Sequence, residues 1–418
     1  MNALRTLCIA LALAFAVPAQ ADSLPDPKAA EAALWASPRV AQARAELAVQ
    51  TLKGQGLQRG REEWNVGADV ARRSIDSAAR DNQAEWGLAL SRPLRLPARA
   101  AADRALAGAA VAQAEASLGE ALHESGRQLL ALWFAWLGEA DQAKRWKAQH
   151  DVATEQLAVV NARIRLGEAP RAERANAEAA LAQARLQAQQ AASRAQQARS
   201  RVLAHYPALV VPADLELSAP VPPEGGAEAH VEAALAHNHE LAQARRHAAR
   251  LRAEARQLAS QRGVDPSLGV YYRNEGGGEE QVIGLNVGLT LPGPARRYEQ
   301  HAAEQSSVAA EAAAVALEHR LRQEARADFE AAVAAFADWQ QAERAAEAQE
   351  EAARLAARAY GLGEGELDSV LMTRRLALET RLQARQAQVV ALAAEARLRL
   401  DSHRLWSLDL DTVADGRA

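Results

Sequence analysis

The sequence has too few large residues to fill a thick globular core and too few thiols for a disulfide scaffold. Cys8 is the only cysteine among 418 residues, and aromatic residues make up 4% of the chain. Apolar residues reach 49%, but alanine, which buries little area per residue, is the largest part of that share. Because alanine is the best helix former, we expect long, thin and closely packed helices.

Two further absences exclude other classes of protein. The formal net charge of −4 is small and both signs are interspersed, so no polyanionic partner is expected. After the N-terminus, the longest apolar run is LLALWFAWL (Leu129–Leu137), about half of the ~20 residues that a transmembrane helix needs. No nucleophile–base pair, phosphate-binding loop or pair of acids is recognisable, so neither an enzyme nor a cofactor is expected.

Residues 1–21 have the pattern of a secretory signal peptide. A basic residue precedes an apolar stretch from Leu7 to Val17, and Ala19–Ala21 forms a small-x-small cleavage site. Cys8 lies inside the apolar stretch, whereas a lipid-attachment cysteine would lie at its end. The mature chain is expected to begin near Asp22 without a thiol, which excludes disulfides, thiolate metal sites and cysteine nucleophiles.

The rest of the chain is a tandem repeat with an offset of about two hundred residues. ALWASPRVAQARAEL returns as ALAHNHELAQARRHA, EWGLALSRPLRLPARA as QVIGLNVGLTLPGPARR, and RLGEAPRAERANAEAAL as GLGEGELDSVLMTRRLAL. The two repeats span residues 22–205 and 227–406. A proline-rich connector, 206–226, joins them, and residues 407–418 form a C-terminal tail.

Each repeat predicts one helix, two short strands and two long helices, in that order. The first helices are expected at 27–61 and 227–261, and the strands at 64–72, 85–94, 266–274 and 281–291. The next helices, 98–166 and 295–362, each end at a glycine break. At a rise of about 1.5 Å per residue they would each reach roughly 100 Å, a length for which a compact globule has no use.

The four strands alternate between large apolar residues and small or polar ones. The large residues share one parity: Trp64, Val66, Val70, Trp86, Leu88, Leu90, Leu268, Val270, Tyr272, Ile283, Leu285 and Val287. This alternation is typical of a membrane β-barrel wall, although a hairpin that lies on soluble helices would show it too. Four strands cannot close a barrel, and open edges in lipid would leave backbone groups without partners, so several chains must contribute.

The signal peptide, the duplicated helix–hairpin–helix–helix unit and the glycine breaks occur together with prolines at each strand-to-helix passage, namely Pro93, Pro97, Pro292 and Pro294. In this order and duplication the chain resembles the TolC family of outer-membrane efflux proteins. The resemblance implies a mainly α fold with a small β part. Duplicated long-helix hairpins would form an α-helical barrel, and the four strands of each chain would contribute to a trimeric, twelve-strand membrane β-barrel.

The resemblance also implies a function and a location. It implies the outer-membrane channel of a tripartite efflux system in a Gram-negative bacterium, with most of the chain in the periplasm. The partners would be two further copies of the chain, a periplasmic adaptor, an inner-membrane RND-type pump and outer-membrane lipid, but no nucleic acid. The chain is most similar to the CzcC-like branch, which exports divalent metal cations.

Two alternatives remain open for the function. A drug or protein export duct of the same family would have the same architecture, because the sequence does not name the cargo. A periplasmic coiled-coil structural protein that forms no channel would explain the helices and the export signal. It would not explain alternating strands at matching places in both repeats.

In the TolC family the adaptor contacts the two helical tips. The matching residues here are Arg165, Leu166, Gly167 and Glu168 in the first repeat and Leu362, Gly363 and Glu364 in the second. Glycine ends a helix because it adopts a positive φ, and a plain interhelix turn would use it in the same way. The third residue of each tip is acidic where the family has an apolar one, so these tips should prefer a basic adaptor loop.

The resemblance implies a gate next to the second tip. Tyr360 matches the tyrosine of the family gate, while the aspartate positions of the family fall on Ser369 and Met372. The candidate acidic partners of Tyr360 are therefore Glu364, Glu366 and Asp368. A tunnel that is less tightly closed is the alternative.

Two clusters of distinctive residues are expected to be structural. His230, His237 and His239 lie close in sequence, but helical metal pairs need a spacing of three or four, and His237 and His239 are predicted to point to different faces. No metal site is therefore expected there. The aromatic group Trp133, Phe134 and Trp136 is predicted to be helix-packing core.

We expect the exported protein to be cleaved after Ala21, because the small-x-small pattern ends there. Mass spectrometry of the mature protein from the cell envelope measures its N-terminus directly. A chain that still begins at Met1, or that carries a lipid on Cys8, would show that the assignment of the export signal is wrong.

Overall fold

A computed structural model describes residues 23–60, 62–75, 81–213 and 216–406. The predicted signal peptide, with Cys8 and the cleavage site, lies outside the described residues, and so does the predicted C-terminal tail. The chain divides into two compact units. The first comprises the residues up to Ala33, Leu129–Glu224 and Glu330–Arg397, and the second comprises Leu34–Gln128, Gly225–Phe329 and the residues from Leu398. Each unit thus contains segments of both halves of the chain.

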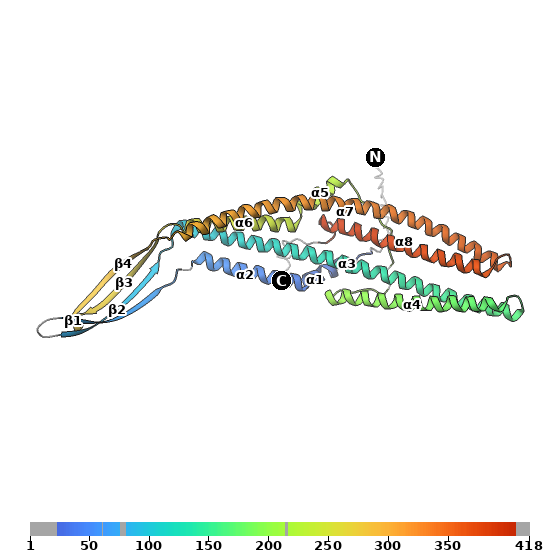
Figure 1. Ribbon diagram of the computed structural model, residues 1–418, viewed down its shortest axis with the longest axis horizontal. Helices are drawn as coiled ribbons and strands as arrows, with labels where there is room; N and C mark the ends of the chain where they lie inside the picture. Colours follow the sequence, from blue (N-terminus) through green and yellow to red (C-terminus); the bar gives the residue numbers. More distant parts are fainter. Residues whose placement is uncertain (1–22, 61, 76–80, 214–215, 407–418) are drawn as a thin grey trace, which may run out of the picture. The chain divides into compact units, whose positions relative to one another are not determined.

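The fold is mainly α with one small sheet, as predicted, and the two halves have the same order of elements (Figure 1). The first half contains α1 (Pro27–Trp35), α2 (Pro38–Arg59), β1 (Asn65–Ile75), β2 (Asp81–Pro93), α3 (Pro97–Leu166) and α4 (Arg171–His205). The second contains α5 (Ala227–Ala236), α6 (His239–Ser260), β3 (Asp265–Glu275), β4 (Glu280–Thr290), α7 (Ala295–Gly361) and α8 (Leu367–Asp401), with a short 3₁₀ turn, η1 (Gly276–Gly278), between the strands. In the part of the chain described, no helix is apolar over a stretch long enough to cross a membrane.

The single helix predicted at the start of each half is in fact two helices, and a capping residue separates them. Ser37 lies between α1 and α2 in an extended conformation, accepts a hydrogen bond from the Val40 amide at 3.4 Å, and precedes a proline at the first helical position. Asn238 caps α6 in the same way, with a 2.7 Å hydrogen bond from the Leu241 amide. Both residues are favoured N-caps, so local sequence causes each break.

Small residues at intervals of seven define the buried stripes of the long helices. On α4 the stripe is Ala177, Ala184, Ala191 and Ala198, and on α8 it is Val370, Ala377, Ala384, Ala391 and Leu398. A strict seven-residue repeat keeps one face of a helix against its neighbour and imposes a left-handed supercoil. Alanine at these positions lets the helix axes approach closely. The alanine content of the sequence is therefore used for packing as well as for helix propensity.

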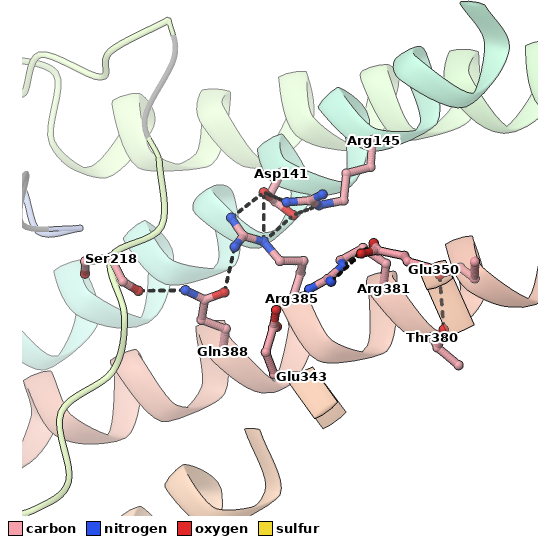
Figure 2. A network of polar contacts seen from close by, with 10 residues as sticks. Asp141, Arg145, Ser218, Glu343, Glu350, Thr380, Arg381, Arg385 and Gln388 are labelled. Atoms are coloured by element: carbon pink, nitrogen blue, oxygen red, sulfur yellow. Dashed lines mark hydrogen bonds and ion pairs between the residues drawn. The ribbon is translucent and has the colours of Figure 1, made fainter. Parts of the chain in front are cut away.

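Polar bridges supplement these thin alanine seams in the first unit (Figure 2). Arg381 of α8 forms ion pairs with Glu343 and Glu350 of α7. One turn further along α8, Arg385 contacts the carboxylate of Asp141 on α3 at 3.1 Å. Asp141 and both arginines are largely buried, so removal of the Asp141 carboxylate or of the Arg381 guanidinium leaves partly buried charges without their ion-pair partners.

The four strands form one antiparallel sheet in the order β1-β2-β3-β4 (Figure 1). The two hairpins therefore join through β2 and β3, which come from different halves of the chain. In the register, Val66 pairs with Leu90, Leu90 with Val270 and Val270 with Leu285, so one apolar residue from each strand lies in a single row. Ala68, Leu88, Tyr272 and Ile283 form the adjacent row.

The predicted parity of the strands is confirmed by this register, because the large apolar residues share one face of the sheet. Nearly all of them are exposed, and Val66, Ile283 and Leu285 reach 77%, 81% and 73%. The other face carries small and polar residues, among them Ser91, Gly269 and Asn286. Glycine on this face makes room for a neighbour, because a Cβ at Gly284 would overlap the ring of Tyr271 on β3.

An arginine from each half ties the sheet to the helices that follow it. Arg99, at the start of α3, and Arg296, at the start of α7, both form ion pairs with Asp265, the first residue of β3. Arg296 also donates to the carbonyl of Gln261 at 2.7 Å. The predicted passage prolines lie at this place: Pro93 ends β2, Pro97 begins α3, and Pro292 and Pro294 lie between β4 and α7.

Candidate functional site: the helical tips

The two tips, α3–α4 and α7–α8, have the same backbone structure. At the first, the amide of Gly167 donates to the carbonyl of Ile164 (3.1 Å), and the amide of Glu168 donates to that of Arg163 (2.9 Å). At the second tip, the amide of Gly363 donates to the carbonyl of Tyr360 (3.1 Å), and the amide of Glu364 donates to the carbonyl of Ala359 (3.0 Å). This is the Schellman pattern, which places a residue with positive φ just beyond the helix. Gly167 and Gly363 occupy that position with φ of 77° and 79°.

The seven predicted tip residues lie in the last turn of a long helix or in the turn just beyond it. Arg165 and Leu166 end α3, and Leu362 directly follows the last residue of α7. Leu166 and Leu362 are 72% and 68% exposed, which is unusual for large apolar side chains at matching positions. A Cβ built at either tip glycine meets no atom within 4 Å, so the turn has open space around it. Each tip thus presents an apolar side chain and a carboxylate beside an accessible backbone turn.

Tyr360 is held beneath the second tip by contacts with the first helical hairpin. It is 8% exposed, and its hydroxyl donates a 2.8 Å hydrogen bond to Oε2 of Glu173 on α4. The guanidinium carbon of Arg163, on α3, lies 4.5 Å from the centre of the tyrosine ring. Burial raises the pKa of Tyr360, and the neighbouring carboxylate of Glu173 raises it further, so the hydroxyl keeps its proton.

The acidic partners expected for Tyr360 are not its partners in this structure. Asp368 accepts a 3.0 Å hydrogen bond from Asn176 on α4, and Glu364 and Glu366 are exposed. The carboxylates predicted from the sequence all lie beyond the second tip. Glu173, in the first turn of α4, could not be predicted from the sequence, because α3–α4 and α7–α8 come together only in the folded chain. Tyr360–Glu173 and Asn176–Asp368 are therefore two polar links between the hairpins.

An apolar cluster lies under these polar links. Val160 of α3, Ala177 of α4, Tyr360 of α7 and Leu367 and Val370 of α8 are buried against one another. All four long helices contribute, so the tip region is a small packed core and not a pair of independent turns.

The aromatic group Trp133, Phe134 and Trp136 lies nearer the start of α3. Its members are 1%, 4% and 3% exposed, which is consistent with the predicted packing role.

The single helix expected over 227–261 would have carried both His237 and His239. His237 and His239 do not share one helix, because the cap at Asn238 separates α5 from α6. Their rings lie 5.1 Å and 4.9 Å from the ring of His403, which follows α8. His123 of α3 stacks on His403 from the other side. Asn238, a favoured N-cap residue between the two histidines, is the sequence signal for this break. In the described part of the chain, no group of three or more His, Cys, Asp or Glu side chains is arranged to hold a metal ion.

The fold is that of bacterial outer-membrane channels of known structure. The chain is similar to the CmeC outer membrane channel of Campylobacter jejuni, with a TM-score of 0.72 and 13% identity over 93% of this chain and 87% of that one. It is similar to the outer membrane protein VceC of Vibrio cholerae (TM-score 0.67, 17% identity, 91% and 99% covered) and to the MtrE outer membrane channel of Neisseria gonorrhoeae (0.62, 17%, 91% and 90%). No protein-family model matches the chain, and no curated protein sequence matches it.

Replacement of Tyr360 by Phe should loosen the second tip, because it removes the hydrogen bond to Glu173 and keeps the ring. A hydrogen bond to a charged group is worth about 1.5–3 kcal/mol, and partial exposure of Glu173 places the expected loss near the lower end. Native-state hydrogen exchange of the Gly363 and Glu364 amides measures the free energy of local opening. Tyr298→Phe, at an exposed tyrosine of the same helix, is the matched control. Equal protection in the two variants would show that the Tyr360–Glu173 hydrogen bond does not stabilise the second tip.

Proposed function

We propose that this protein is the outer-membrane channel of a tripartite efflux system and works as a homotrimer. The observation that carries the proposal is the sheet, whose one face exposes rows of large apolar side chains that no other described part of the chain covers. A face of this kind is costly in water and favourable in lipid. The likeness in fold to three outer-membrane channels supports the same conclusion.

The edges of the sheet account for the trimer. Among the described strands, β1 and β4 each pair on one side only. In lipid, the backbone groups on their other sides need partners, and only a closed barrel provides them. Four strands from each of three chains would close a twelve-strand barrel, with β4 of one copy beside β1 of the next. The small and polar face of the sheet would then line the interior.

The tips are the proposed contact with a periplasmic adaptor, which would connect the channel to an inner-membrane pump. Leu166 and Leu362 offer apolar anchors, and Glu168 and Glu364 offer carboxylates to a basic loop. The proposed gate consists of Tyr360 with Glu173 as its partner, together with Asp368 and Asn176. Opening would separate the α7–α8 hairpin from α3–α4 and break both links.

Divalent metal cations are the proposed cargo, on the sequence resemblance to the CzcC-like branch. Drugs or exported proteins are the alternative cargo for the same duct. The competing structural role, a periplasmic coiled-coil protein, leaves the exposed apolar face of the sheet unexplained. A carbonate wash of the membrane fraction distinguishes the two roles, because a peripheral protein is released and a barrel is retained.

The Leu285→Arg variant should fail to insert stably into the outer membrane, since Leu285 lies within the apolar row that would face lipid. Arginine near the middle of the bilayer costs about 2–4 kcal/mol on a barrel surface, and every trimer carries three copies. Asn286→Arg is the matched control, because the next residue along β4 lies on the opposite face. Carbonate-resistant, trimeric protein is measured for both variants. Equal insertion of the two would contradict the lipid-facing assignment.

Replacement of both tip glycines by Trp should abolish efflux-dependent resistance while the trimer and its membrane location stay normal. A large side chain would block an approaching adaptor loop and would force a positive φ on a non-glycine residue. Asn at both positions is the control, because it tolerates this backbone conformation and adds little bulk. Resistance to zinc, cobalt and cadmium is compared with resistance to organic toxins, which also identifies the cargo. Wild-type resistance in the Trp double variant would exclude a docking role for the tips.

A further inference from the structure

His403, just beyond the end of α8, has a positive φ at the position where the tips have glycine. The amide of His403 donates to the carbonyl of Leu400 (3.0 Å), and the amide of Arg404 donates to that of Arg399 (2.7 Å). This is the hydrogen-bond pattern of the tips, but the residue with positive φ is His403, at 54°. Among the described residues, His403 is the sole non-glycine residue with positive φ. A strained conformation of this kind persists where surrounding contacts hold it, and it is common at switches.

Three other histidine rings are among the contacts of His403. Its ring centre lies 4.9 Å from that of His239, 5.1 Å from that of His237 and 5.8 Å from that of His123, the last in a stacked arrangement at 15°. His123 and His239 are 6.0 Å apart. Four of the ten histidines of the chain thus meet in one histidine cluster, made of His123, His237, His239 and His403.

The cluster brings together three places in the second unit. His123 is buried on α3, His237 and His239 flank the cap between α5 and α6, and His403 follows α8. The ring of His239 packs on Gly119 of α3, where an added Cβ would lie 2.5 Å from Nδ1. These rings therefore hold the end of α8 and the α5–α6 junction against α3.

Charged groups on several elements lie near the cluster. They act on His123, on the neighbouring Glu120 and His230, or on their partners: Arg39 on α2, Glu124 and Arg127 on α3, Glu240 on α6, Arg320 and Asp328 on α7, and Asp401 and Arg404 at the end of α8. Asp401 lies 3.4 Å from Nε2 of His123 but also 3.0 Å from Arg127, and Glu240 lies 2.6 Å from Arg320. These arginines reduce the negative charge that Asp401 and Glu240 offer to a protonated ring.

Three groups in this region have pKa values away from their usual ranges, two histidines lowered and one glutamate raised. Burial lowers the pKa of His123 to about 3, an effect that Arg127 strengthens, so this ring does not accept a proton near neutral pH. Burial raises the pKa of Glu120 to about 7, so below that pH its carboxyl is protonated and offers no negative charge to the rings. His230 also has a pKa below its usual value, because of burial.

We propose that the histidine cluster is an acid-sensitive latch that holds the last turn of α8 on α3 at neutral pH and releases it on acidification. Histidine is the side chain whose charge responds to mild acidification. Two protonated rings about 5 Å apart repel each other, and the neutral, packed arrangement around His403 is lost. The backbone strain at His403 then favours release, because the ring contacts that held it are gone.

Global unfolding is a poor measure of this latch. His123 has a lowered pKa in the folded state, so its contribution is full above pH 6.5 and is lost as the pH falls toward 3. Glu120 has a raised pKa, so its contribution is present below pH 4.5 and is lost as the pH rises toward 7. Between pH 4.5 and 6.5 the two changes offset each other, and only a local measurement isolates the cluster.

The test is amide hydrogen exchange of the full-length protein in detergent at pH 7.5 and pH 5.0, expressed as protection factors. The amides of His403, Arg404 and Leu241 report the end of α8 and the start of α6. Their protection should fall by at least about tenfold at pH 5.0, since uptake of one proton changes an equilibrium about tenfold per pH unit. The tip amides of Gly363 and Glu364 should keep theirs.

His403→Gly is the decisive variant, because it places at the end of α8 the residue that both tips already use. It should keep high protection at both pH values. His403→Asn, which also tolerates a positive φ and does not titrate, should do the same. His319→Gln, at an exposed histidine of α7, should retain the wild-type fall. The proposal is overturned if wild-type protection does not change with pH, or if the glycine and asparagine variants lose protection as the wild type does.

Discussion

Close approach of long helices through small side chains is the constraint on which the other features of this protein depend. The buried stripes of α4 and α8 repeat every seven residues and consist mainly of alanine. Such a stripe brings helix axes together but buries little area for each residue. The helices must therefore be long, and charged side chains such as Arg381 and Arg385 add specific bridges between them. A few bulky residues gather where more elements meet, as at Trp133 and Tyr360.

The sheet differs from the helices, because its large apolar residues are exposed on one face instead of buried. Each strand contributes one apolar residue to each row, and the rows join strands from both halves of the chain. Glycine on the other face leaves room for neighbouring side chains, as at Gly284 beneath Tyr271. Helix and sheet thus divide the chain into parts suited to different surroundings, and the ion pairs of Arg99 and Arg296 with Asp265 connect them.

Three helix ends in the chain share one hydrogen-bond pattern but use different residues for it. At the tips, glycine gives the turn without strain and leaves open space around it, which suits a surface that another molecule approaches. At the end of α8, histidine occupies the same position and needs the rings around it. The residue at one backbone position therefore distinguishes an open turn from one that is held by its neighbours.

The strands, the long helices, the strand parity and the glycine turns of both halves could be predicted from the sequence, because hydrophobic period, proline and glycine act over a few residues. The sequence did not determine the partners of Tyr360 or the site of the histidines. Glu173 reaches Tyr360 only when two hairpins pack together, and His123, His239 and His403 come from three distant segments. The N-cap residues Ser37 and Asn238 are local signals for the helix breaks, but the packing of His237 and His239 against His403 is not visible in the sequence around them. Contacts between segments far apart in the chain depend on packing, and packing is decided by the tertiary structure alone.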